Sequence, residues 1–290
     1  MTEQNSQHRR TGPTALRWQS QAVLLAIVPV AAIWVTLEGG QAWAARSLVL
    51  WFATVISVVL AALVFSTRAA TLGAAITGGI FTAALYLQTP GFHTALWPLL
   101  ALLLLTFGAT RFGRHRKEAL GVAEARRGRT ASQVAANLGV ATLAGIPQIM
   151  GQFSDVVFLS PRFTLVPMLA AMAEATADTV SSELGQVLGG EPRLITNLQR
   201  VPAGTDGAVS LVGTLFGVVA AAVVVLVGLA VLPLNHRDAV IAVVCGIAGT
   251  VLDSFLGALP ERRGWLNNDV VNALSTLFAA ALAACALRWL

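Results

Sequence analysis

The chain has 290 residues, of which 56% are hydrophobic and only 11% are charged, and its formal net charge is +5 at pH 7. So large an apolar fraction excludes a water-soluble globular domain and indicates a polytopic membrane protein. The positive charge does not indicate nucleic-acid binding, because no zinc, helix-turn-helix or RNA-binding signature accompanies it, and we expect no nucleic-acid partner.

Apolar stretches of about 20 residues predict an all-α fold, a polytopic bundle of about nine transmembrane helices. The expected spans are 20–37, 46–66, 69–88, 92–109, 132–150, 163–188, 207–232, 239–259 and 269–288. Cys245 and Cys285 both fall inside spans, so we interpret them as small hydrophobic residues. The Ala-Trp-Ala sequence at 42–44 resembles a signal-peptidase site. The length of the first apolar run nevertheless favours a retained helix.

The 19 basic residues are distributed unevenly between the two sides of this topology. With the N-terminus inside, 15 of them fall on cytoplasmic segments and four on the opposite side. The positive-inside rule therefore predicts a cytoplasmic N-terminus, and we expect a bacterial inner-membrane protein. We divide the chain into a cytoplasmic tail (1–19), a four-span scaffold (20–110) and a catalytic membrane domain (111–290), which opens with a basic cytoplasmic loop (111–131).

Polar residues recur at helical spacing from the fifth span onward, whereas the interiors of the first four spans contain no ionisable residue. Many of these polar groups fit the alternative interpretation, in which Ser, Asn and Gly serve helix packing alone. Asp178 and Asp253 fit it poorly, because a carboxylate in hydrocarbon costs at least a few kcal/mol. A weak repeat relates 207–217 to 269–279 and predicts two parallel hairpins that bring both aspartates to one cytoplasmic mouth.

The segment VPAGTDGAVS (201–210) lies on the same predicted side. Gly204 and Gly207 would let backbone N–H groups turn toward an anion at a helix N-terminus. A helix entry with a Thr or Asp cap is the simpler alternative. Carboxylates, a glycine loop and arginines on one side favour a site for Mg²⁺ and phosphate groups.

Four ordered motifs carry a resemblance to a known family. They are ADTVSSELG (177–185), RLITNLQRVPAGTDGAVSLVGTLFG (193–217), GTVLDSFLGA (249–258) and LNNDVVNALS (266–275). Together they resemble the integral membrane family called domain of unknown function 92, which includes transmembrane protein 19 and the phytyl-phosphate kinase of vitamin E synthesis. The resemblance covers about 110–290. Val180 replaces the family's usual Trp, and Leu138 replaces a usual Gly, which bears on substrate preference.

The resemblance implies a membrane-embedded kinase that converts a prenyl (phytyl-like) monophosphate to the diphosphate. The co-substrate would be a nucleoside triphosphate, with CTP favoured, and the cofactor Mg²⁺. We expect the metal ligands to be Asp178, Glu183 and Asp253. We expect the nucleotide to be held by Arg200, Gly204, Thr205, Asp206 and Gly207. We expect the transferring phosphates to be neutralised or oriented by Lys117, Arg193, Asn268 and Asn272, with Asp178 and Asp253 as the catalytic carboxylates.

Two other classes of function stay open. A cytidylyltransferase acting on a lipid phosphate would need the same metal and nucleotide groups. A transporter or flippase would also use repeats and buried carboxylates, although these usually lie at the bilayer midplane. The expected partners are the lipid bilayer, the prenyl phosphate and the nucleotide, and a homodimer is left open.

Overall fold

The computed structural model of the chain describes residues 16–123, 128–147 and 160–289. Most of the predicted tail, part of the basic loop (124–127) and the end of the fifth predicted span (148–150) lie outside these residues. The described elements are α1 (Arg17–Ala44), α2 (Leu48–Ser66), α3 (Leu72–Gln88), α4 (Leu96–Arg111), α5 (Arg114–Leu120), α6 (Ala131–Ala144), α8 (Arg162–Leu188), β1 (Arg193–Leu194), β2 (Ala208–Val209), α9 (Leu211–Val231), α10 (His236–Leu256), the π-helical turn η2 (Gly257–Glu261) and α11 (Asn268–Trp289).

Each predicted span overlaps one of these helices, so the helical membrane-protein class is confirmed. The fifth span was expected to reach residue 150, but α6 ends at Ala144. Length and apolarity qualify five of them to cross a membrane: α1, α2, α9, α10 with η2, and α11. A sixth results if α4 and α5, which meet at 58°, form one broken span. The apolar helix α3 is too short for the same test. The nine-span count and the cytoplasmic N-terminus therefore stay predictions.

Side-chain caps fix where several helices begin. Ser47, Thr71, Thr130, Ser210 and Asn235 each accept a hydrogen bond from a backbone N–H two or three residues further on. Such caps satisfy amides that have no partner within the helix. The cap at Ser210 corrects the seventh predicted span, which was expected from residue 207, because α9 begins only at Leu211.

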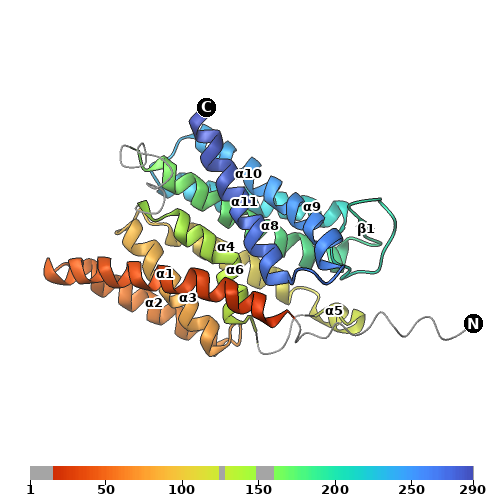
Figure 1. The fold of residues 1–290 in the computed structure, drawn as a ribbon, viewed down its shortest axis with the longest axis horizontal. Coiled ribbons are helices and arrows are strands. Elements are labelled where there is room, and N and C mark those ends of the chain that lie inside the picture. The colour runs from red at the N-terminus through yellow and green to blue at the C-terminus, as the bar shows by residue number, and fades with distance from the viewer. Residues whose placement is uncertain (1–15, 124–127, 148–159, 290) are drawn as a thin grey trace, which may run out of the picture.

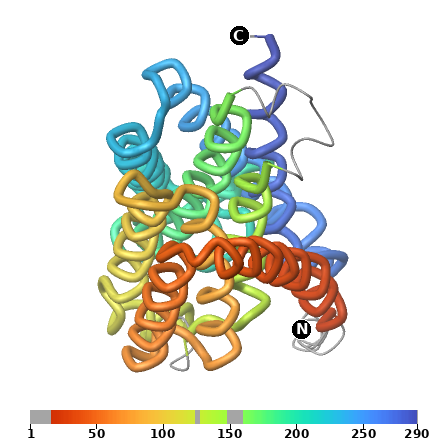
Figure 2. Tube along the Cα trace, turned by 90° about the vertical axis from the view of Figure 1, so that its left-hand side faces the viewer, coloured from red at the N-terminus to blue at the C-terminus, as the bar shows by residue number. Residues whose placement is uncertain are grey.

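Helix α8 forms the axis of the bundle. Its residues from Thr164 to Ala177 are all buried, and it contacts α4, α6, α9, α10 and α11. Figures 1 and 2 show α1 to α3, in red to orange, as a layer along one side of this later group of helices. The hydrophobic core runs along α8 accordingly.

Small residues let two neighbours approach α8 closely. A Cβ added to Gly217 of α9 would lie 2.9 Å from the backbone oxygen of Ala177. A Cβ added to Gly246 of α10 would lie 2.8 Å from the Cβ of Ala173. Close backbone approach through small residues is the usual means of packing membrane helices, because lipid supplies no hydrophobic drive between them. The interpretation of these glycines as packing residues therefore holds here.

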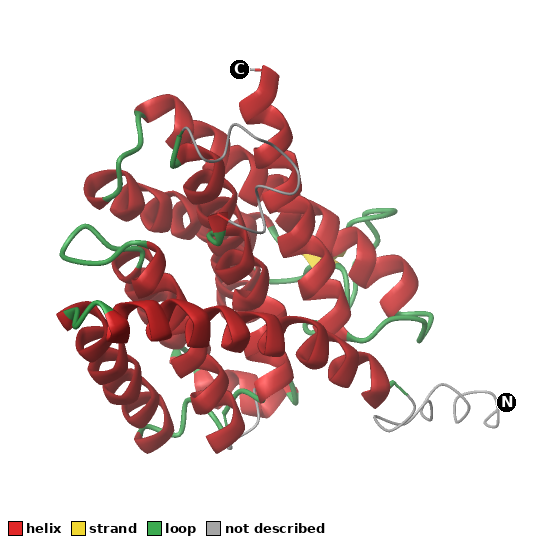
Figure 3. Ribbon diagram, turned by 60° about the vertical axis from the view of Figure 1, so that its left-hand side comes forward, coloured by secondary structure: helices red, strands yellow, loops and turns green. Residues whose placement is uncertain are grey.

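The segment between α8 and α9 was predicted as a loop but contains a short β-hairpin. Strands β1 and β2 pair antiparallel, with Arg193 opposite Val209 and Leu194 opposite Ala208 (Figure 3). This hairpin and α5 lie at the same end of the bundle in Figure 1. The starts of α1 and α11 meet there too, where the Gln19 amide donates to the Trp265 carbonyl oxygen at 2.8 Å. This end carries the arginines that the sequence assigns to the cytoplasm.

The orientation can be tested with single cysteines at the two ends of the α4 region. Leu120 and Phe92 are both exposed, at 49% and 72%. In a protein with Cys245 and Cys285 replaced by Ala, we expect Phe92→Cys to react with an impermeant maleimide in intact cells. We expect Leu120→Cys to react only in inverted vesicles, because the basic end faces the cytoplasm. The reverse pattern would overturn the predicted orientation.

Candidate active site

A polar cavity of about 400 Å³ lies at the basic end of the bundle. It is bounded by the second half of α8, the first turns of α9, the end of α10 and the start of α11. The hairpin segment 203–210 also lines it. Hydroxyl, amide and carboxyl groups dominate the side-chain chemistry: Ser181, Ser182, Thr205, Thr214, Thr250, Ser254, Asn268, Asp178, Asp206, Asp253 and Glu261.

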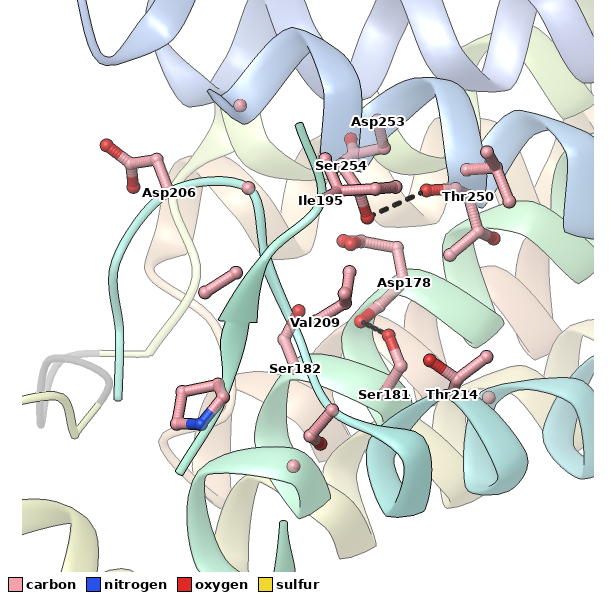
Figure 4. A pocket seen from close by; sticks show the side chains of 18 of the residues that line it. Asp178, Ser181, Ser182, Ile195, Asp206, Val209, Thr214, Thr250, Asp253 and Ser254 are labelled. Atoms are coloured by element: carbon pink, nitrogen blue, oxygen red, sulfur yellow. Dashed lines mark hydrogen bonds between the residues drawn. The ribbon is translucent and has the colours of Figure 1, made fainter. Parts of the chain in front are cut away.

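Asp178 of α8 and Asp253 of α10 point toward each other across this cavity (Figure 4). The Ser275 hydroxyl of α11 donates to Asp253 Oδ2 at 3.2 Å. Glu174, one helical turn before Asp178, is 1% exposed, and its Oε1 has no hydrogen-bond partner among the described residues. The three carboxylates repel one another, and like charges in a buried site require a proton or a cation nearby.

The donor set fits the predicted magnesium ion in part. Asp178 and Asp253 supply carboxylate oxygens, which Mg²⁺ prefers, and the sequence placed both in this role. Among the described residues, no group of three or more His, Cys, Asp or Glu side chains is arranged to hold a metal. Mg²⁺ is commonly bound by one or two carboxylates together with water and substrate phosphates. The site therefore fits a metal that arrives with a phosphate ligand.

The loop predicted to hold phosphates does line the cavity. Gly204, Thr205, Asp206 and Gly207 all contribute to the wall, with the Asp206 side chain turned away from the two facing aspartates in Figure 4. Among the described residues, the N–H groups of Gly204, Asp206 and Gly207 donate no hydrogen bond. Burial within the loop raises the pKa of the Asp206 carboxyl, and the nearby Arg262 opposes that shift. Free amides beside a glycine turn suit an anion.

Gly207 also has a purely structural reason to be glycine. Its φ is +71°, and an added Cβ would collide with the backbone of Ala258 in η2. The hairpin holds its own shape through internal bonds, from the Ile195 N–H to the Gly207 oxygen at 3.1 Å and from the Ala208 N–H to the Thr205 oxygen at 3.0 Å. A substitution at Gly207 would thus disturb packing whatever the loop binds.

Lys117 and Glu183 lie outside the cavity and bind each other. Lys117 is 1% exposed, and its Nζ donates to Glu183 Oε2 at 2.5 Å and to the backbone oxygens of Ala109 and Thr110. These three bonds use all the donors of an ammonium group. Lys117 and Glu183 therefore neutralise each other between α5 and α8, although the charge of Glu183 also acts on Asp178. Their predicted roles at the phosphates and the metal stay predictions.

Of the remaining predicted residues, some line the cavity and others lie outside it. Arg193 donates to the Leu198 oxygen at 3.0 Å, and Arg200 forms an exposed ion pair with Glu191 at 2.7 Å, so both belong to the hairpin outside the cavity wall. Asn268 lines the cavity at the start of α11. Asn272 is buried, with its amide 3.4 Å from the Asn137 side-chain oxygen on α6.

Arg129 is a residue that the sequence placed only within the basic loop. Its Nη2 is 3.4 Å from the Thr179 hydroxyl, and its charge acts on the neighbouring Asp178. The signal that could have found it is Thr130, which caps α6 in a capping box and so places Arg129 directly at a helix start. Glu174 shares the polar stripe of the sixth predicted span with Asp178, at i, i+4 spacing, but that pattern alone assigns it no role.

The apolar helices and the acidic polar cavity at one end define an integral membrane protein. The family model for integral membrane protein DUF92 matches residues 55–280, and the chain belongs to this family. It is 36% identical over 179 residues to an uncharacterized membrane protein of Methanocaldococcus jannaschii, a match that covers 62% of this chain and 70% of that protein. It is 33% identical over 187 residues to an uncharacterized membrane protein of Synechocystis, covering 64% and 70%.

A plant relative is the chloroplastic protein VTE6 of Arabidopsis thaliana, with 33% identity over 178 residues, covering 60% of this chain and 53% of that protein. No solved structure matches the chain significantly. The matched family region includes α8 to α10 and most of α11, and therefore the residues around the cavity.

Stability measurements can test whether the Lys117–Glu183 pair supports the fold. We expect Glu183→Leu to lower the unfolding free energy by about 3 kcal/mol or more, because it leaves a buried ammonium without its carboxylate. The double variant Lys117→Met/Glu183→Leu should recover part of that loss, as measured by thermal unfolding in detergent. A fully stable Glu183→Leu protein would show that the pair does not support the fold.

Proposed function

We propose that the chain is a membrane kinase that phosphorylates a prenyl monophosphate to the diphosphate, using a nucleoside triphosphate and Mg²⁺. The observation that carries the proposal is the facing pair Asp178 and Asp253 beside the glycine loop, in one polar cavity of an otherwise apolar bundle. The family resemblance and the similarity to the plant chloroplastic relative support this reaction class. The cavity would face the cytoplasm, where nucleotides are available.

The reaction needs positioning and charge neutralisation more than acid–base chemistry. An oxygen of the acceptor phosphate attacks the γ-phosphorus, the bond to the β-phosphate oxygen breaks, and the nucleoside diphosphate leaves with the electron pair. The acceptor phosphate is already a nucleophile, so no strong general base is required. A bound magnesium ion would neutralise phosphate charge between the two aspartates.

This chain's own residues would then divide the remaining work. The amides of Gly204 and Gly207 would bind nucleotide phosphate oxygens, and Asn268 would orient an oxygen from the start of α11. Ser275 holds the Asp253 carboxylate in place through its 3.2 Å hydrogen bond. Arg129, whose Nη2 lies 3.4 Å from the Thr179 hydroxyl, brings positive charge to the neighbouring Asp178.

The reaction can be identified from its products. Purified protein with a C20 prenyl monophosphate, CTP or ATP and Mg²⁺ should yield prenyl diphosphate and a nucleoside diphosphate, and EDTA should abolish turnover. Release of pyrophosphate with a cytidylylated lipid would replace the kinase by the cytidylyltransferase. Absence of any covalent product, together with movement of the lipid phosphate across vesicles, would favour the flippase.

The two aspartates should be separately required. We expect Asp178→Asn and Asp253→Asn each to lower kcat/KM at least about 100-fold, because each removes a carboxylate ligand of the magnesium ion that would neutralise the phosphates. Glu191→Gln is the matched control, since its 70% exposed carboxylate lies on the hairpin outside the cavity wall. An aspartate variant that turned over normally in a folded protein would remove that residue from the reaction.

A further inference from the structure

A second, larger space lies on the other side of α6 and α8 from the polar cavity. This groove of about 750 Å³ runs between α2, α3 and α4 and reaches Ala175 of α8. Its floor is apolar and buried, formed by Phe81, Leu99 and Leu102. Its rim includes Leu63 and Leu104, exposed at 55% and 64%, so the groove opens sideways where lipid would surround the bundle.

The groove has the length of one membrane leaflet. Its lining follows α4 from Leu99 to Arg111, twelve residues apart. At a helical rise of about 1.5 Å per residue this distance is about 18 Å. Half of the hydrocarbon thickness of a bilayer is about 15 Å. A molecule lying in the groove with one end at the membrane surface would therefore have its other end near the bilayer centre.

One end of the groove is strongly basic. Among the described residues, Arg68, Arg111, Arg114 and Arg129 line it, against one carboxylate, Glu118, which is paired with Arg114 at 3.1 Å. Arg111 is oriented by a hydrogen bond to the Thr67 carbonyl oxygen at 3.0 Å and by the ring of Phe107. Arginines at the end of an apolar channel complement a phosphate on a hydrocarbon chain, because guanidinium groups bind phosphate oxygens through paired donors.

Arg129 connects this basic end to the polar cavity. Its backbone is fixed to the α2–α3 turn, since its N–H donates to the Ala69 oxygen and its carbonyl oxygen accepts from the Thr71 N–H, both at 3.0 Å. Its side chain reaches Thr179 of α8, next to Asp178 in the sequence. The same guanidinium thus lines the groove and acts on the charge of a cavity carboxylate.

We infer that this groove binds the acceptor of the proposed kinase, a single prenyl chain with one terminal phosphate. The chain lies on Phe81, Leu99 and Leu102, and the phosphate lies at the arginine end beside Arg129. This inference rests on the proposed function and adds where the lipid enters and which residues select it. The nucleotide would bind in the cavity and the lipid chain in the groove, and their phosphates would meet where Arg129 reaches Thr179 beside Asp178.

The groove can be tested by binding alone, without nucleotide. A C20 prenyl monophosphate with a photoreactive group at its hydrocarbon end should cross-link near Phe81 and Leu99 in the full-length protein. Gly78→Phe should weaken its binding about tenfold or more, because an added side chain there meets only open groove space and displaces buried chain. Gly108→Phe is the matched control, since its Cβ also meets nothing but it does not line the groove.

The basic end is tested by comparing the monophosphate with the prenyl alcohol of the same length. Arg129→Gln should weaken monophosphate binding about tenfold and leave alcohol binding unchanged, which also shows that the variant is folded. Arg116→Gln, an exposed arginine outside the groove, should change neither. Cross-links at lipid-facing side chains such as Val59, or in the polar cavity, would overturn the groove while leaving the kinase proposal intact. Cross-links near Phe81 and Leu99 in a protein that shows no turnover would support the groove as a lipid site and overturn the kinase proposal.

Discussion

Carboxylates inside an apolar bundle must be neutralised, and α8 carries three of them between its middle and its C-terminal end. Each is accommodated by a different part of the chain. Glu183 is paired with Lys117 from α5, so its charge is balanced within the fold. Asp178 has Arg129 on one side and Asp253 on the other. Glu174 is buried against α10, where a Cβ on Gly249 would lie 2.6 Å from its side chain. The groups that meet these carboxylates come from α5, the residue before the α6 cap, α10 and α11.

The buried carboxylates of the bundle differ in whether an opposite charge within the fold neutralises them. Lys117 uses all its donors on Glu183 and on two backbone oxygens, so its charge is committed within the fold. The Asp178 and Asp253 pair has a polar opening beside it and one arginine behind it. A bundle selected only for stability gains nothing from two facing carboxylates, because burying like charges is costly. The open pair is therefore the part of α8 that requires a functional explanation.

The helices and the two cavity aspartates could be predicted from the sequence. The other features of the site depend on contacts between residues far apart in the chain. Hydropathy located the helices, and the cost of a buried carboxylate singled out Asp178 and Asp253. The start of α9 was misplaced because Thr205 and Asp206 are also good caps, and only the hydrogen bond at Ser210 decides between them. The partnership of Lys117 with Glu183 joins residues 66 positions apart, and no local pattern reveals it. Gly207 was interpreted through its backbone freedom, whereas its contact with Ala258 depends on how the hairpin folds over α10.

That contact determines how the cavity can be reached. The hairpin touches η2 at Gly207, whose backbone lies against Gly257 and Ala258. Its hydrogen bonds, from Ile195 to Gly207 and from Ala208 to Thr205, are internal. Swinging the hairpin outward would break its packing on Val122 and on η2 but leave its own hydrogen bonds intact. We therefore expect polar solutes to enter and leave the cavity when the hairpin moves as one unit. The rate of their exchange would be set by this movement and not by local unfolding of the hairpin.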